Sequence, residues 1–303
     1  MTLTATGQLY REYCLRRQAG ANGKVAFSGV TGCDVYNPTA PFYEGGQQYI
    51  AARVEPRDSE VSQVRFFHWQ SPGNAQLVAD APSFDLQDPF ICRIDDGWVF
   101  GGVEIAADPD GSGWRWRTQF WWGTSIFSLR PFAVGPWGMK DIRLLQLPDK
   151  RILVFTRPQG AVGGRGKIGW LTLNSLNELN SSRLEQGRLL AQLEDESWCG
   201  VNEAHVLDEQ WVGVLAHVAC FDPAGDRHYY AAAFRFNFVS GQTTPLRIIC
   251  SRADLPAGES KRDDLRDVIF PGGLTRDGQR HRLFCGASDC DVHWREIADP
   301  FLG

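Results

Sequence analysis

The sequence lacks the features that mark membrane, secreted or nucleic-acid-binding proteins. No stretch reaches the about 18 consecutive apolar residues of a membrane-spanning helix, and the N-terminal MTLTATGQLYREYCLRR has no apolar signal core. Lysine and arginine number 31 against 36 aspartates and glutamates, and this net charge of −5 does not suit a nucleic-acid-binding surface. We therefore expect a cytoplasmic protein that has neither nucleic acid nor membrane as a partner.

Paired cysteines are missing as well. The eight cysteines are scattered singly, without the Cys-x-x-Cys spacing of redox or zinc sites. Cys285, Cys290 and His293 are three candidate ligands close in sequence, but the alternation of a strand would point them in different directions. We expect reduced thiols, no metal and no organic cofactor.

Helix signals are scarce, whereas short runs rich in Val, Ile, Phe and Trp recur between turn-forming residues. One pattern appears five times: a polar residue, an apolar strand, a turn, and a second apolar strand that ends in a polar residue. Tight turns are predicted at Asp96-Gly97, Asp149-Lys150 and Asp277-Gly278. The copies span residues 37–55, 88–104, 141–157, 202–217 and 271–289.

The first residues of successive copies are 51, 53, 61 and 69 positions apart. This spacing fits propeller blades with insertions better than a sandwich, whose strands recur roughly every 8–12 residues. We therefore predict an all-β fold, a five-bladed β-propeller that forms a single domain over residues 1–303.

Polar residues of the five copies are predicted to meet at one mouth, because the first strand of an antiparallel pair starts where the second ends. The leading residues differ between copies: Asn37, Asp88, Asp141, Asn202 and the segment Pro271 to Gly273. A purely structural repeat would reuse one residue, so this variation favours a ligand site. The alternative is that these residues only hydrogen-bond neighbouring blades.

Two further segments have two interpretations each, and a third has one. The loop 159–169, QGAVGGRGKIG, contains five glycines and either cradles phosphate or forms a flexible hairpin. In WRWRTQFWW, aromatic and cationic residues alternate; sugars stack on such faces, but core packing is favoured for Trp114 and Trp116. The run 259–267, ESKRDDLRD, is predicted to be a solvated connection.

Several stretches together resemble glycosyltransferase family 108, formerly a domain-of-unknown-function family. The resemblance covers most of the chain from about Asp34 to Asp289. That family is related to the β-mannoside phosphorylases of glycoside hydrolase family 130, which are five-bladed propellers. The stretches are MKDIRL, FTRPQG, GGRGKIGW, NEAHV and PGGLTRDGQRHRLFCGASD, with NPTAPF, ARVEPRDSE and QDPF upstream.

The resemblance implies an inverting reaction on β-1,2-linked mannose oligosaccharides, the reserve carbohydrate mannogen. Phosphate attacks the anomeric carbon of the terminal mannose and gives α-mannose 1-phosphate, and the reverse reaction extends the chain. The implied partners are therefore β-1,2-linked mannose oligosaccharides and inorganic phosphate or mannose 1-phosphate. Some family members also transfer mannose from GDP-mannose, which is an alternative donor here.

This chemistry needs a protonated carboxyl to assist the leaving oxygen and a cationic pocket to hold the phosphate. By the resemblance, Asp88 is the catalytic acid, and we assign the phosphate to Lys140, Arg157 and Lys167. Gln87, Phe90 and Asp141 depart from the family 130 pattern and agree better with the family 108 branch. The residues that match mannose contacts are Asn37, Arg53, Gln87, Asp141, His205 and Asp289.

Two other functions stay open. An inverting glycosidase needs a general base roughly 6.5 to 9.5 Å from the acid, with Glu203 or Glu104 as candidates. A non-catalytic carbohydrate-binding propeller would not depend on Asp88.

Overall fold

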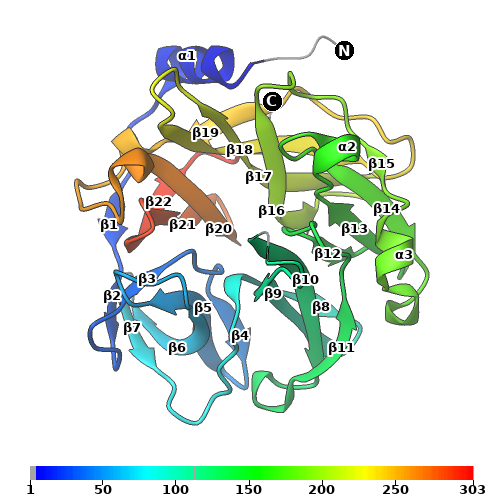
Figure 1. Cartoon of the computed structure of the whole chain (residues 1–303), viewed down its shortest axis with the longest axis horizontal. Coiled ribbons are helices and arrows are strands. Elements are labelled where there is room, and N and C mark those ends of the chain that lie inside the picture. Colours follow the sequence, from blue (N-terminus) through cyan, green and yellow to red (C-terminus); the bar gives the residue numbers. More distant parts are fainter. Residues whose placement is uncertain (1–4, 72, 112, 303) are drawn as a thin grey trace.

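The computed structural model describes residues 5–71, 73–111 and 113–302, and β-strands are its main element. Figure 1 shows the sheets following one another around a common centre. The longest helix, α1 (Thr6–Arg16), lies outside them and stacks its Tyr10 ring on Tyr230, with centroids 4.5 Å apart. No helix in the described part of the chain is both long and apolar enough to cross a membrane.

The N-terminal half forms two sheets. The first has six strands in the order β2-β7-β6-β5-β3, with β4 paired to β5, and the second has four in the order β11-β10-β9-β8. The strands of the first are β2 (Ala26–Ser28), β3 (Asp34–Tyr36), β4 (Phe42–Glu44), β5 (Gln47–Glu55), β6 (Gln63–Ser71) and β7 (Asn74–Leu77). Those of the second are β8 (Gln87–Ile94), β9 (Gly97–Ala107), β10 (Trp114–Gly123) and β11 (Arg130–Val134).

The C-terminal half also forms two sheets. One has four strands: β12 (Arg143–Gln146), β13 (Ile152–Thr156), β14 (Gly169–Leu173) and β15 (Arg188–Leu189). The other has eight: β16 (Trp198–Val206), β17 (Trp211–Phe221), β18 (Arg227–Asn237), β19 (Arg247–Cys250), β20 (Asp267–Asp277), β21 (Arg280–Ala287), β22 (Asp291–Ile297) and β1 (Asn22–Lys24). Within it β18 and β20 pair in parallel at two residue pairs, whereas the neighbours on either side are antiparallel. The eight strands therefore divide into two antiparallel groups.

The N-terminal strand β1 completes the last of these groups. It pairs with β22 from Asn22 opposite Arg295 to Lys24 opposite His293. The next strand, β2, pairs instead with β7 of the first sheet. The segment between these strands thus links the last group to the first sheet.

The short helices are α2 (Gly160–Gly163), α3 (Ser181–Leu184), η1 (Ile126–Ser128), η2 (Leu176–Glu178), η3 (Arg252–Asp254) and η4 (Asp263–Leu265).

Each copy of the sequence pattern is an antiparallel strand pair. The pairs are β4 with β5, β8 with β9, β12 with β13, β16 with β17, and β20 with β21. Two predicted turns are wrong by a residue. Ile94 pairs with Gly97, so the β8–β9 turn is Asp95-Asp96, with φ 53° at Asp95. Asp277 pairs with Arg280, so the β20–β21 turn is Gly278-Gln279. Gly97 belongs to the strand, where its lack of a Cβ admits the Trp122 indole.

The core lies between neighbouring sheets, because the second strands are buried on both faces. In β9, Trp98 and Phe100 pack with the first sheet, whereas Val99 packs with the residues of β12, β13 and β14. Burying one such side chain contributes about 1.5–3 kcal/mol. A continuous apolar run such as that of β9 is what two buried faces require.

The closest packing between the first sheet and the strand group that contains β20 is made at a glycine. At Gly272, in the bulge of β20 between Pro271 and Gly273, an added Cβ would overlap the carbonyl oxygen of Pro38. We expect Gly272→Ala to lower the free energy of unfolding by about 1–3 kcal/mol, because the backbone must shift. Gly7→Ala is the control, since helix α1 has room for its Cβ and Ala favours helix. Urea unfolding curves measure both, and equal stability of the two variants would contradict the prediction.

Candidate active site

A cavity of about 210 Å³ opens where the first strands of the groups begin. Polar and charged side chains make up most of its wall, with Leu265, Val268 and Phe270 as the apolar part. It brings together eight residues predicted from the sequence: Asn37, Arg53, Gln87, Asp88, Lys140, Asp141, Arg157 and Asp289. His217 also lines it, together with seven residues that the sequence did not predict: Glu60, Arg227, Tyr229, Arg262 and the three apolar residues.

The leading residues take an unusual backbone conformation. Asn37, Asp88 and Asp141 have φ of 45°, 50° and 58°, and Asp289 has 53°. This left-handed region is unfavourable for most residues with a side chain, and Asn and Asp tolerate it best. Such residues interrupt the strand pairing, as the register shift of β8 between Gln87 and Phe90 shows. Strain of this kind gathers at functional sites, where the rest of the fold holds it in place.

Asp88 is held by two neighbours from the first sheet. Asn37 Nδ2 donates to Asp88 Oδ1 at 2.7 Å, and Arg53 Nη1 lies 3.5 Å from the same oxygen. Gly286 allows this arrangement, because a Cβ there would overlap the Asn37 side chain. The Asp88 residue is 7% exposed, so its carboxyl is nearly enclosed.

Arg53 is itself fixed by a buried carboxylate. Glu55 Oε2 accepts from Arg53 Nη2 at 2.6 Å and Nε at 3.2 Å, while its Oε1 accepts from Tyr36 at 2.7 Å and from Lys261. Burial would raise the pKa of Glu55, but Arg53 and these hydrogen bonds lower it. The run 259–267 is thus not a solvated connection throughout: the Lys261 side chain is 5% exposed, and Arg262 lines the cavity.

The opposite wall is cationic. Arg157 Nε donates to Cys199 O at 2.9 Å, and its Nη1 lies 3.5 Å from Asp141 Oδ2. Burial would raise the pKa of Asp141, but Arg157 and Lys140 outweigh it and lower the pKa to about 2. Burial also lowers the pKa of His217 to about 3, so the imidazole is neutral at pH 7. Its Nδ1 lies 2.9 Å from Asn202 Oδ1, which orients the ring.

Three buried polar atoms of the lining lack a hydrogen-bond partner among the described residues: Asn37 Oδ1, Asp141 Oδ1 and Arg157 Nη1. Buried polar groups are normally satisfied, because an unmet one costs about 1–3 kcal/mol. Unmet donors and acceptors on one small cavity indicate a polar ligand.

Two predicted residues lie outside the lining. His205 is three residues beyond Asn202 on β16, where its Nε2 lies 2.9 Å from Glu203 Oε2 and its ring contacts Phe301. Lys167 Nζ pairs with Asp195 Oδ1 at 2.8 Å. No residue of the glycine-rich loop 159–169 is in the lining of this cavity. Its Arg165 carbonyl accepts from Arg157 Nη2 at 3.4 Å, and Gly166 leaves room for that guanidinium.

The proposed glycosidase bases are also absent from the lining. Glu104 Oε2 accepts from Arg117 Nε at 2.5 Å, and Glu203 Oε2 accepts from Leu274 N at 2.6 Å. Glu60 is at the cavity, but its carboxylate is 66% exposed and paired with Lys261 and Arg262 at 3.1 Å. Among the residues described, no group of three or more His, Cys, Asp or Glu is placed to hold a metal ion.

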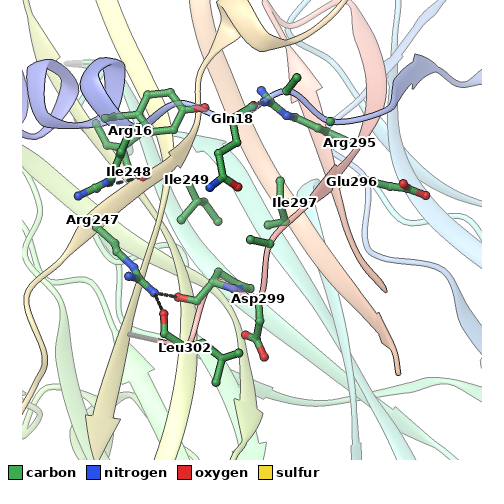
Figure 2. Close-up of a pocket in the computed structure, with 15 residues that line it drawn as sticks. Arg16, Gln18, Arg247, Ile248, Ile249, Arg295, Glu296, Ile297, Asp299 and Leu302 are labelled. Atoms are coloured by element: carbon green, nitrogen blue, oxygen red, sulfur yellow. Dashed lines mark hydrogen bonds between the residues drawn. The ribbon is translucent and has the colours of Figure 1, made fainter. Parts of the chain in front are cut away.

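A larger cavity of about 420 Å³ lies between α1, β19 and β22 (Figure 2). Its arginines are engaged: Arg247 Nη2 donates to Pro300 O at 2.9 Å and to Leu302 O at 2.5 Å, and Arg295 pairs with Asp254. Figure 2 shows the hydrogen bonds of Arg247 along the wall of the cavity. They tie the C-terminal segment to β19.

The chain matches a family model described as a protein of unknown function, DUF1861, over residues 14–303. The structure of MPT-4, a mannose phosphorylase from Leishmania mexicana in complex with phosphate ion, is similar, with 32% identity and a TM-score of 0.90. That match covers 97% of this chain and 93% of the other. The predicted resemblance to mannoside-acting enzymes is confirmed.

Two further structures extend the comparison. MPT-1, a GDP-Man-dependent mannosyltransferase from Leishmania mexicana, has 27% identity and a TM-score of 0.88, with 98% of this chain and 96% of the other covered. A β-1,2-mannobiose phosphorylase from Listeria innocua shares the fold, with a TM-score of 0.65 at 13% identity over 89% and 92% of the chains. No curated protein sequence matches.

Asp289 makes the stability of the folded protein depend on pH. Burial raises its pKa, Arg53 opposes this and Asp88 adds to it, and the result is about 6 against an ordinary 3.8. The folded protein then binds this proton more tightly than the unfolded chain, so stability falls as the pH rises from about 4 to about 6. We expect Asp289→Asn to remove this pH-dependent loss of stability. Between pH 3 and pH 7 the free energy of unfolding of the variant should rise by about 3 kcal/mol relative to that of wild type.

Urea unfolding of both proteins across that pH range measures the difference. Asp141, whose lowered pKa acts in the opposite direction, is present in both proteins and cancels. A constant difference between the variant and wild type at every pH would contradict the prediction.

Proposed function

We propose, from the premise that this chain belongs to the DUF1861 family, that it is an inverting phosphorylase of β-1,2-linked mannosides. The observation that carries the proposal is a buried carboxyl, Asp88, in one cavity with the cationic Lys140 and Arg157. Similarity to a mannose phosphorylase over nearly the whole length of both chains supports it. The reverse direction would extend the mannoside chain, with GDP-mannose as an alternative donor in view of the similar mannosyltransferase.

The proposal includes the fold, which we infer to be a five-bladed β-propeller. Three separate sheets and the two antiparallel groups of the eight-stranded sheet would be the blades of a five-bladed β-propeller. The pairing of β1 with β22 would close the last blade, so residues 1–303 would form one catalytic domain. The cavity then lies at the mouth, where the first strands begin.

Asp88 acts as the proton donor in this reaction. A phosphate oxygen forms a bond to the anomeric carbon while the glycosidic C–O bond breaks, and the Asp88 proton passes to the leaving oxygen. The products are α-mannose 1-phosphate and a mannoside shorter by one unit. Asn37, Arg53, Gln87, Asp141 and Asp289 contact the mannose, and Asn37 and Arg53 also position Asp88.

Phosphate binds the opposite wall. Arg157 Nη1 is a buried donor without a hydrogen-bond partner among the described residues, and Lys140 supplies a second charge. Charge-assisted hydrogen bonds to phosphate are the strongest such contacts, and arginine is well shaped for them. The neutral His217 leaves Nε2 as an acceptor if Nδ1 donates to Asn202 Oδ1, which suits a phosphate that carries a proton.

Hydrolysis by the same site is less well supported. An inverting hydrolase needs a carboxylate base beside the attacking water. Glu203 and Glu104 lie outside the lining, and Glu60 is occupied by Lys261 and Arg262. The cationic wall suits an anionic nucleophile better than water.

Wild-type protein given α-mannose 1-phosphate and mannose should release phosphate and form β-1,2-mannobiose. Asp88→Asn should lower this rate by about 10²–10⁴-fold, because the amide cannot supply the proton. Asp96→Asn, at the β8–β9 turn far along the strand, is the matched control and should keep the wild-type rate. Phosphate release and product linkage are the measurements. A near wild-type rate in a folded Asp88→Asn sample would refute the assignment.

Arg157→Ala should act mainly on phosphate. We expect the KM for phosphate to rise by about tenfold or more, while the KM for the mannoside stays within about twofold. Arg151→Ala removes an arginine that pairs with Asp149 at the surface and serves as the control. Steady-state phosphorolysis at varied phosphate and varied mannoside gives both constants. A change confined to the mannoside KM would show that the phosphate lies elsewhere.

A further inference from the structure

The hairpin of β9 and β10 continues past the inner strand of its sheet. Gln87, at the start of β8, pairs with Val103, and β9 then runs on from Glu104 to Ala107. These residues pair with Trp114 to Arg117 of β10. On the other edge of β10, Gly138 N donates to Trp116 O at 2.8 Å and Met139 bridges Arg117. Gln87 lines the active-site cavity, and the hairpin end therefore stands at its edge.

One face of this hairpin end is aromatic. Trp114 is 70% exposed and lies opposite Ala107, and the partly exposed Trp116 lies opposite Ile105, which is 36% exposed. The expected core packing of Trp114 is therefore wrong, because β10 here extends beyond the neighbouring sheet. Large exposed aromatic groups are uncommon outside binding surfaces. We call Ile105, Trp114 and Trp116 the rim face.

The charges of the hairpin lie on its other face. Arg115 and Arg117 cover the Trp137 ring, with Cζ 3.9 Å and 4.3 Å from its centroid, and Arg117 also pairs with Glu104. The rim face is consequently aromatic and aliphatic. Such a face suits an uncharged ligand that offers C–H groups, as a pyranose ring does, better than an anion.

Hydrogen bonds connect the rim face to the phosphate-binding arginine. Trp116 Nε1 donates to Gln159 Oε1 at 3.0 Å, and Gln159 Nε2 donates to Arg165 O at 3.0 Å. The same carbonyl accepts from Arg157 Nη2 at 3.4 Å. The glycine-rich loop thus fixes the Trp116 indole relative to the wall of the cavity, and the rim face is continuous with the site.

The size of the cavity limits what it encloses. Its volume of about 210 Å³ is below the roughly 300–1,000 Å³ of pockets that surround drug-sized ligands. Phosphate and the reacting sugar would occupy it, so further units of a chain must lie outside. The rim face is the exposed aromatic surface that the loop 159–165 connects to the cavity.

We propose that the rim face binds the non-reacting mannose units of an oligosaccharide, with a sugar ring stacked on Trp114. This inference rests on the proposed function, since it takes the chain to be a mannoside. Trp116 and its bond to Gln159 hold the face in place. In this arrangement the second mannose, which carries the leaving oxygen, lies at the mouth of the cavity, and later units extend over the rim face. We therefore expect the enzyme to prefer longer chains.

The test compares β-1,2-mannobiose with β-1,2-mannotetraose. Trp114→Ala should weaken binding of mannotetraose, and lower its kcat/KM, by about three- to tenfold, the range of one aromatic contact. Both quantities for mannobiose should stay within about twofold. Trp114→Phe should recover most of the loss, since it restores an aromatic ring. Tyr43→Ala, a 67% exposed aromatic beside the β4–β5 turn, is the matched control.

Isothermal titration without phosphate gives the affinities, and phosphorolysis gives the rates. Equal effects of Trp114→Ala on both lengths, or no effect on either, would overturn the inference. So would weakened binding of GDP with mannotetraose unaffected, because the face would then hold a base. If wild type cleaves no mannoside yet binds mannotetraose through Trp114, the rim face stands and the phosphorylase proposal fails.

Discussion

Asn37 directly follows β3, Asp88 is the second residue of β8 and Asp141 precedes β12, and each adopts a left-handed backbone. The site depends on this constraint. A regular strand would send successive side chains to opposite faces of its sheet, into the packing between neighbours. The left-handed residue breaks that alternation, and the side chain lines the central cavity instead. Asn and Asp suit this role because their short polar side chains tolerate positive φ and can bind a ligand.

The cost of gathering charge at the centre is offset by pairing. Glu55 binds Arg53, Lys261 and Tyr36, so Arg53 reaches Asp88 from a fixed position. A buried ion pair contributes little net stability, but removing one partner leaves an uncompensated charge. The role of Glu55 is therefore to place Arg53. A flexible surface arginine without such a partner would hold Asp88 less well.

The repeated strand pairs and eight of the lining residues follow from the sequence because the pattern of strand, turn and strand is local. The sequence does not show that His205 lies outside the lining, because the pattern gives neither the start of β16 at Trp198 nor its bulge at Asn202. Arg227 and Tyr229 lie on a third strand, outside the two-strand pattern. Lys261 meets Glu55 across 206 positions, and no local signal distinguishes it from a solvated lysine.

Asp141 and Asp289 lie in different environments within the cavity, which shift the pKa values of their carboxyl groups in opposite directions. Arg157 and Lys140 keep Asp141 ionised, whereas burial and the charge of Asp88 raise the pKa of Asp289 to about 6. The charge of Arg53 opposes this rise in the pKa of Asp289. Arg53 Nη1 also lies 3.5 Å from Asp88 Oδ1, so one guanidinium serves both carboxyl groups. In the proposed reaction it would stabilise the carboxylate that Asp88 becomes once the leaving oxygen has been protonated.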